Sequence, residues 1–230
     1  MHTDQSQQFI LASGSPRRSF LLKACGFDFV VNPSQASEEF DDTTLAEEVP
    51  SLLAIRKAEA SRNVHPNARL ILTADTVVIL NNQILNKPVD EADAIRMLGK
   101  LSNNSHVVIT AVALSTTTTI EVITCRSIVR FLSLNPKEIA HYVEHFRPLD
   151  KAGAYGAQEC LPDHYNPCSQ EEINFLKVIG KPDLLQNSKP QALDVSPLIA
   201  IKEIEGSYFN VMGLPIHLIY ASINSILSKK

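Results

Sequence analysis

One run of residues constrains this 230-residue chain more than any other: ARLILTADTVVIL, at positions 68–80. It is rich in β-branched residues and predicts one long strand. A carboxylate, Asp75, interrupts the otherwise apolar run. Because burying an unpaired charge is costly, such a residue usually lies at a strand end, binds a metal or acts as a base. The plain alternative is a hydrogen-bonded structural aspartate at a bulge.

Shorter runs on either side of it alternate between strand and helix patterns. Strands are predicted at 9–12, 27–31, 83–85, 106–114 and 120–132. Helices are predicted from Pro16 to Cys25, from about 45 or 51 to 62, and over 91–101, 136–146 and 215–227. Ser15 and Asp90 are the predicted N-caps of the first and third helices. This interleaving predicts a single α/β domain over residues 1–230.

Residues 160–200 do not fit this rhythm. They contain five of the thirteen prolines and two of the four cysteines, and few periodic runs. We expect an irregular insertion with one helix near 170–178, dispensable for chemistry. Cys160, His164 and Cys168 are spaced by four, which on a helix would suit zinc, but Pro162 and Pro167 argue against a continuous helix.

Composition narrows the function classes. The chain is 44% hydrophobic with a net charge of −4 and a pI near 6.0, so it lacks the basic surface that binding to a DNA or RNA polymer needs. It has no apolar run of the roughly 18 to 20 residues that span a membrane. The polar N-terminus MHTDQSQQ does not look like a signal peptide. We expect a cytoplasmic protein with free thiols, whose contact with nucleic acid is limited to a single nucleotide.

The segment Ser13-Gly14-Ser15-Pro16-Arg17-Arg18 lies between a predicted strand and a predicted helix. Free N–H groups at a helix start, two hydroxyls and two guanidinium groups can together bind phosphate. The alternative is an ordinary capped helix with surface arginines. Lys87 precedes a proline that fixes the backbone behind it, although an exposed lysine there is most often part of a turn.

The segment DKAGAYGAQ at 150–158 is rich in glycine and alanine, which lets backbone approach a ligand closely. Gln158 offers both a hydrogen-bond donor and an acceptor, as reading the edge of a base requires. A tight loop is the alternative. Glu38, Glu39 and Lys57 would, on their own, be taken for solvated surface charges.

Taken together, these segments resemble the Maf family of nucleotide pyrophosphatases. The resemblance begins at LASGSPRRSFLLKACG, continues through Glu38-Glu39 and the helix around Lys57, and resumes at TADTVVIL and NKPVDEADAIRML. It then covers LSNNSHVVITAVAL, PLDKAGAYGAQ and IEGSYFNVMGLP, nearly the whole chain in the family's order.

The resemblance implies an elongated, mixed and strongly twisted sheet flanked by helices, with a cleft between two lobes. It implies cleavage of nucleoside triphosphates to a monophosphate and pyrophosphate, with Mg²⁺ or Mn²⁺. Asp75 would be the general base, and Glu38 and Asp75 would bind the metal. Glu38, Lys57, Asp75 and Lys87 would line the catalytic cleft, while Ser13, Arg17 and Arg18 would hold phosphates.

Three positions are similar to the family branch that prefers dTTP and UTP: Arg17, Thr76 and Gln158. The branch that prefers 7-methyl-GTP tends to have other residues there. The resemblance therefore implies a house-cleaning pyrimidine nucleotide pyrophosphatase. A 7-methyl-GTP pyrophosphatase and a non-catalytic nucleotide-binding regulator of cell division are the alternatives, and a homodimer is left open. Two departures from the family stand out: Glu159 in place of glycine, and the long insertion at 160–200.

Overall fold

The computed structural model describes residues 8–162, 165–184 and 198–228. The chain falls into two compact units, each assembled from separate stretches. Unit 1 takes residues 1–76, 110–125 and 213–230, and unit 2 takes residues 77–109 and 126–212. Strands β3 (Leu70–Leu80), β5 (Ser105–Ser115) and β6 (Ile120–Phe131) each contribute residues to both units. The single domain stays a prediction.

The described strands form one seven-stranded mixed sheet in the order β2-β1-β3-β5-β6-β7, with β4 paired to β3 off that path. β1 (Phe9–Leu11) lies parallel to both β2 (Val30–Val31) and β3. β4 (Gln83–Leu85) is antiparallel to β3, and β7 (Ile201–Glu205) is antiparallel to β6. Parallel strands joined by helices confirm the predicted α/β class.

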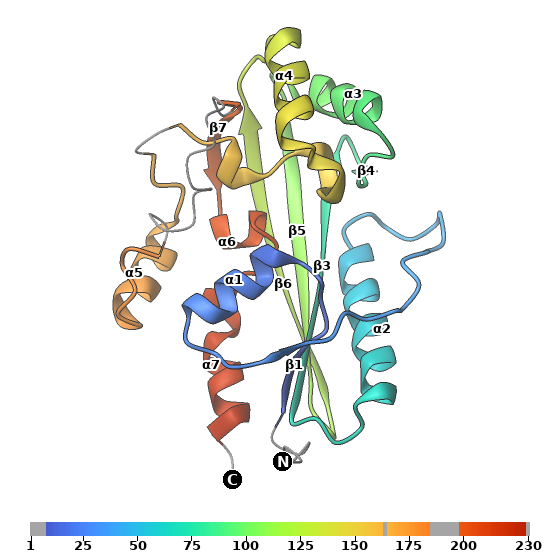
Figure 1. Cartoon of the computed structure of the whole chain (residues 1–230), viewed down its shortest axis with the longest axis vertical. Coiled ribbons are helices and arrows are strands. Elements are labelled where there is room, and N and C mark those ends of the chain that lie inside the picture. Colours follow the sequence, from blue (N-terminus) through green and yellow to red (C-terminus); the bar gives the residue numbers. More distant parts are fainter. Residues whose placement is uncertain (1–7, 163–164, 185–197, 229–230) are drawn as a thin grey trace. The chain divides into compact units, whose positions relative to one another are not determined.

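Unit 1 holds the helices α1 (Pro16–Ala24), α2 (Val49–Val64) and α7 (Ile216–Ser228). Figure 1 shows α2 running alongside β3. The Thr73 hydroxyl of β3 donates to the carbonyl of Ala54 in α2 at 2.7 Å, and alanines of α2 and β5 pack in the interface. Small side chains let the helix approach the sheet closely, and this fixes the height of α2 along β3.

Unit 2 holds the helices α3 (Glu91–Leu101), α4 (Pro136–Phe146), α5 (Gln170–Val178) and α6 (Tyr208–Val211). α3 and α4 lie against each other (Figure 1). Three single-turn 3₁₀ helices follow α4: η2 (Pro148–Asp150), η3 (Ala152–Ala154) and η4 (Ala157–Glu159). They form the segment that carries Gln158.

Most predicted elements are confirmed with their ends moved by a few residues. The strand predicted at 27–31 is only Val30–Val31, and β7 and α6 were not predicted. Asp90 caps α3 as expected, accepting from the Asp93 amide at 2.7 Å. Ser15 occupies the N-cap position of α1, but its side chain makes no capping hydrogen bond. Within the described parts of the chain, no helix is both long and apolar enough to span a bilayer.

The insertion at 160–200 is more ordered around α5 than its composition indicates. α5 spans the predicted residues, and Glu172 within it is fully buried. Its carboxylate accepts hydrogen bonds from the Ser207 hydroxyl at 2.6 Å and from the amides of Tyr208 and Phe209 at 3.1 and 2.9 Å. The Ser169 amide and hydroxyl also donate to it, at 2.9 and 3.1 Å. The expectation that this segment is dispensable therefore needs correction, because it supplies a buried partner to α6.

All four cysteines are free thiols, as expected. Cys160 and Cys168 were two of the three candidate zinc ligands, and His164 lies outside the described residues. Burial raises the pKa of both thiols well above the ordinary range, so both stay protonated near neutral pH.

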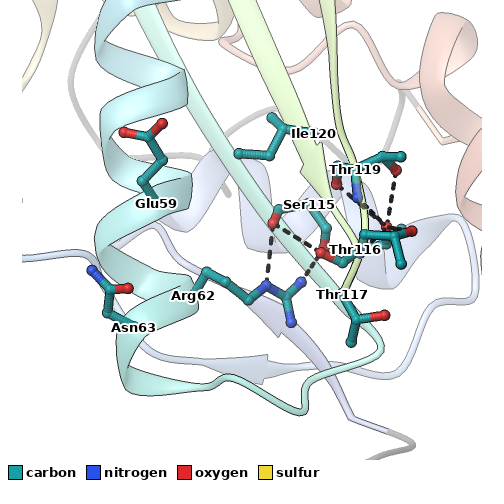
Figure 2. A pocket seen from close by; sticks show the side chains of 9 residues that line it. Glu59, Arg62, Asn63, Ser115, Thr116, Thr117, Thr119 and Ile120 are labelled. Atoms are coloured by element: carbon teal, nitrogen blue, oxygen red, sulfur yellow. Dashed lines mark hydrogen bonds between the residues drawn. The ribbon is translucent and has the colours of Figure 1, made fainter.

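Beside the hairpin between β5 and β6, unit 1 has a hollow of about 270 Å³ (Figure 2). Its most prominent side chain, Arg62, donates to the Ser115 hydroxyl at 3.3 Å and to the carbonyl oxygens of Ser115 and Ala68. Arg62 thus fastens α2 to the hairpin through main-chain acceptors. None of the predicted site residues lines this hollow.

Candidate active site

The loop between β1 and α1 is organised around Ser13. Its hydroxyl accepts from the Ser15 amide at 3.3 Å and from Nη1 of Arg18 at 2.9 Å. The Ser13 hydroxyl, rather than the predicted Ser15 side chain, therefore fixes the entry to the helix. Pro16 occupies the first helical position as predicted.

Arg18 links this loop to two other parts of unit 1. Its Nη1 also donates to the Ala74 carbonyl at 2.9 Å, its Nη2 to the Thr76 hydroxyl at 3.1 Å, and its Nε to the Gly213 carbonyl at 2.8 Å. The Thr76 hydroxyl in turn lies 2.9 Å from that of Thr110. Four of the five guanidinium N–H groups are thereby engaged with the protein.

Burial lowers the pKa of Arg18 to about 10, against the opposing effect of the nearby Asp75 and Glu38 carboxylates and with that of Arg17. Arg18 therefore keeps its positive charge at neutral pH. Arg17, one residue earlier, is half-buried. Arg18 therefore lies near enough to Asp75, Glu38 and Arg17 for their charges to act on it.

Lys57 joins the two carboxylates. Its Nζ donates to Oδ1 of Asp75 at 2.6 Å and lies 2.7 Å from Oε1 of Glu38. The side chains of Lys57 and Asp75 are only 11% and 13% exposed, whereas that of Glu38 is 55% exposed. Asp75 is thus a half-buried carboxylate paired with Lys57, and the exposed Glu38 contacts the same ammonium group.

Local structure explains why these three side chains meet. Lys57 projects from α2, which the Thr73 hydroxyl docks on β3 two residues before Asp75. The loop that carries Glu38 is tied to the same helix, because the Ser34 hydroxyl donates to the Lys57 carbonyl at 3.2 Å and Arg56 donates to the Ser37 carbonyl at 3.1 Å. Unit 1 therefore holds seven of the predicted site residues: Ser13, Arg17, Arg18, Glu38, Lys57, Asp75 and Thr76.

The other two predicted residues, Lys87 and Gln158, belong to unit 2. Lys87 is exposed after β4, and the carbonyl of Asn86 before it accepts from the Gly153 amide at 3.2 Å. Gln158 is half-buried in η4. The segment that carries the predicted base-reading amide is therefore bonded to the residue before Lys87. That both side chains face Asp75 stays a prediction.

Residues 8–163 match the family described as Maf-like protein, and this stretch is more than half of the chain. The chain belongs to the Maf family. Curated relatives align along almost their whole length. A dTTP/UTP pyrophosphatase of Bacteroides fragilis is 37% identical over 220 residues, which are 95% of this chain and 96% of the relative.

Two further relatives carry the same name. The protein of Phocaeicola vulgatus is 38% identical over 96% of this chain and 97% of its own length, and that of Symbiobacterium thermophilum is 37% identical over 92% and 90%. Among solved structures, the Ham1 protein of Staphylococcus aureus matches with a TM-score of 0.41 and 18% identity, over 54% of this chain and 71% of that protein.

The carboxylates of this Maf-family site fit a hard divalent cation in chemical type. Asp75 and Glu38 supply oxygen donors, which Mg²⁺ and Mn²⁺ prefer, and each carboxylate has a second oxygen besides the one on Lys57. The described residues contain no cluster of three or more His, Cys, Asp or Glu side chains suited to a metal. A cation held here would need oxygen ligands from a substrate and from water as well.

Two buried groups of unit 2 that contact the segment around Gln158 were not recognised from the sequence. Tyr142 of α4 donates its hydroxyl hydrogen to Oε2 of Glu159 at 2.6 Å and accepts from the Gly156 amide at 3.0 Å. Nε2 of His106 lies 2.8 Å from the Tyr155 hydroxyl, with Phe131 packed edge-on against both rings. No local pattern pairs these residues, since their partners are 14 to 49 positions away.

His106 should make the protein acid-sensitive. Burial lowers the pKa of His106 to about 3, well below the 6.5 of an unfolded histidine. The contribution of the neutral His106 to the free energy of unfolding is fully present above pH 6.5. It is lost as the pH falls toward 3, by at most about 1.4 kcal/mol per pH unit. Urea unfolding between pH 7 and 4.5 should show a shallower pH dependence for His106→Gln than for the wild type. Parallel curves would contradict this assignment.

Proposed function

We propose that this Maf-family chain is a pyrophosphatase that hydrolyses dTTP and UTP to the monophosphate and pyrophosphate. The observation that carries the proposal is the Lys57 ammonium held between Asp75 and Glu38, in the same unit as the half-buried Arg18. Relatives named dTTP/UTP pyrophosphatase at about 37% identity over nearly the full length support the substrate.

The positive groups would neutralise the polyanionic triphosphate. Arg17 would contact phosphate oxygens, and Ser13 would offer its hydroxyl and the adjoining loop amides. Because most N–H groups of Arg18 are engaged by the protein, we infer that Arg18 acts mainly through its charge and by fixing Ser13 and Thr76. Lys57 and Lys87 would stabilise charge that develops on the departing pyrophosphate.

Asp75 would act on the attacking water. Its Oδ1 accepts from Lys57, which fixes the carboxylate and leaves Oδ2 to orient the water and take its proton. The water oxygen would bond to the α-phosphorus while the bond to the bridging oxygen breaks and pyrophosphate leaves with those electrons. Asp75 and Glu38 would hold a divalent cation, which when bound supplies Lewis-acid stabilisation of the phosphate charges.

Base choice would rest on Thr76 and Gln158, together with Arg17. A uracil or thymine edge presents two carbonyl acceptors around one N–H donor, and an amide can complement both kinds of group. The three residues also separate this proposal from a 7-methyl-GTP pyrophosphatase. Retention of the Lys57 cluster separates it from a regulator that only binds nucleotides, because such a protein needs no paired carboxylates.

A panel of nucleoside triphosphates with Mg²⁺ or Mn²⁺, scored for pyrophosphate release, tests the proposal. We expect dTTP and UTP to be cleaved with the highest kcat/KM. Preferential cleavage of 7-methyl-GTP would replace the proposed substrate. Nucleotide binding without any pyrophosphate release would reject the enzyme and favour the regulator.

Gln158→Glu should weaken dTTP and UTP hydrolysis much more than stability. A carboxylate can accept from the base N–H but cannot donate to a carbonyl, so we expect a loss of about 1–3 kcal/mol in transition-state binding. The measurement is kcat/KM for dTTP and dGTP, with the exposed Gln170→Glu as control. An unchanged ratio of dTTP to dGTP hydrolysis would remove Gln158 from base recognition.

A further inference from the structure

The backbone on either side of Gln158 folds as a series of short turns. The Ala154 amide donates to the Lys151 carbonyl at 3.1 Å, and the Glu159 amide donates to the Gly156 carbonyl at 3.0 Å. Gln158 lies inside the second of these turns, between its two bonded ends. Its direction therefore depends on how firmly Gly156 and Glu159 are held together.

A side-chain relay joins the same two residues a second time. The Gly156 amide donates to the Tyr142 hydroxyl at 3.0 Å, and that hydroxyl donates to Oε2 of Glu159 at 2.6 Å. With the backbone bond from Glu159 to Gly156, these contacts close a ring around Gln158. We call this ring, made of Tyr142, Gly156 and Glu159, the turn clamp.

Two members of the turn clamp, Tyr142 and Gly156, are buried, and Glu159 is half-buried. Tyr142 is 1% exposed and stacks on Phe146 at 4.9 Å between ring centroids. Burial raises the pKa of Tyr142 well above its ordinary value, so its hydroxyl stays protonated and can donate. The Glu159 side chain is 17% exposed, and its Oε1 lies 3.7 Å from Nζ of Lys151, which balances its charge.

Gly156 and the carboxylate of Glu159 also interlock in space. A Cβ atom added at Gly156 would lie 2.7 Å from Oε2 of Glu159, closer than such atoms approach in proteins. The carboxylate thus occupies the space that the missing side chain leaves. The side chain of Glu159, the residue after Gln158, therefore lies against Gly156 of the same turn.

We propose that Glu159 is a positioning residue that, through the turn clamp, holds Gln158 in the pose that selects dTTP and UTP. This inference rests on the proposed function. What the turn clamp requires of residue 159 is an acceptor for the Tyr142 hydroxyl, not a negative charge. A glutamine at 159 can supply that acceptor, whereas alanine cannot.

Four variants separate this role from a general effect of charge: Glu159→Ala, Tyr142→Phe, Glu159→Gln and, as an exposed control on α4, Glu144→Ala. For Glu159→Ala and Tyr142→Phe we expect KM for dTTP to rise about tenfold, with kcat within about threefold. The preference for dTTP over dCTP should fall by about fivefold or more. Glu159→Gln and Glu144→Ala should stay within about threefold of wild type.

The double variant Glu159→Ala/Tyr142→Phe should be no worse than the poorer single variant, because both break the same relay. Unchanged base preference in both single variants would overturn the proposal, even if their melting temperatures fell. Equal behaviour of Glu159→Gln and Glu159→Ala would also overturn it, because charge would then be the property that matters.

Hydrogen exchange at the Gly156 amide gives a readout that does not depend on turnover. Loss of protection in Glu159→Ala and Tyr142→Phe, with protection retained in Glu159→Gln, would support the turn clamp. Equal protection in all variants would overturn it. Absence of pyrophosphate release from dTTP and UTP by the wild type would reject the proposed function instead, and the exchange result would still decide whether Glu159 holds the turn.

Discussion

Replacing Asp75 by asparagine is expected to lower kcat for dTTP hydrolysis by about a thousandfold or more, because one change removes a proposed base and a proposed metal ligand. Asparagine is nearly isosteric and can still accept from Lys57 through its amide oxygen. Folding and much of the nucleotide binding should therefore persist. Pyrophosphate release, melting temperature and dTTP binding are the three quantities to measure.

The matched control is Asp28→Asn, which changes an exposed aspartate of the same unit and should stay within about twofold of wild type. Activity of Asp75→Asn within a few-fold of wild type would exclude Asp75 as a central catalytic group. A large fall in dTTP binding with little change in kcat would assign Asp75 to substrate binding instead.

The second large effect concerns stability. Glu172→Ala would leave the Ser207 hydroxyl and the amides of Tyr208 and Phe209 facing an empty buried space. Removing one partner of such a buried charged network costs about 3–5 kcal/mol. Backbone N–H groups donate to both oxygens of the Glu172 carboxylate. Glu172→Gln should therefore also be destabilising, because its NH₂ group would meet a backbone N–H in either orientation.

Urea unfolding measures this, with Glu171→Ala, an exposed neighbour in the same helical turn, as control. A loss in Glu172→Ala no larger than that in Glu171→Ala would contradict the role assigned to the buried carboxylate.

For the same reason, replacing residues 161–196 by a short linker should prevent folding rather than leave an active enzyme. The replaced segment contains Glu172 and also the buried Leu176 and Leu184.

The sequence predicts the fold well where local signals are strong. Asp90 and the Asn135-Pro136 pair mark the starts of α3 and α4, and the β-branched runs mark β3, β5 and β6. It fails where an element depends on distant partners. α6 is a single turn held by Glu172 from 35 to 37 positions away, and β7 is a short strand fixed by pairing with β6.

The same distinction applies to the candidate site. Resemblance to a family identifies Lys57, Asp75 and Glu38, and the structure shows that the first bridges the other two. Neither residue type nor spacing indicates that most N–H groups of Arg18 donate to the protein itself, or that Glu159 turns toward Tyr142. Those contacts arise from packing, which no short segment of sequence encodes.

The bond from Arg18 to the Gly213 carbonyl has a consequence for the chain during its synthesis. It joins residues 195 positions apart, so a ribosome adding about 5 to 20 residues per second needs roughly 10 to 40 s to reach the second partner after the first. Until then the growing chain can carry every proposed catalytic side chain and most partners of Arg18, but Nε of Arg18 lacks its acceptor. Nascent chains that have not yet reached Gly213 are therefore expected to leave cellular dTTP intact, and cleavage should begin only after this residue has been added.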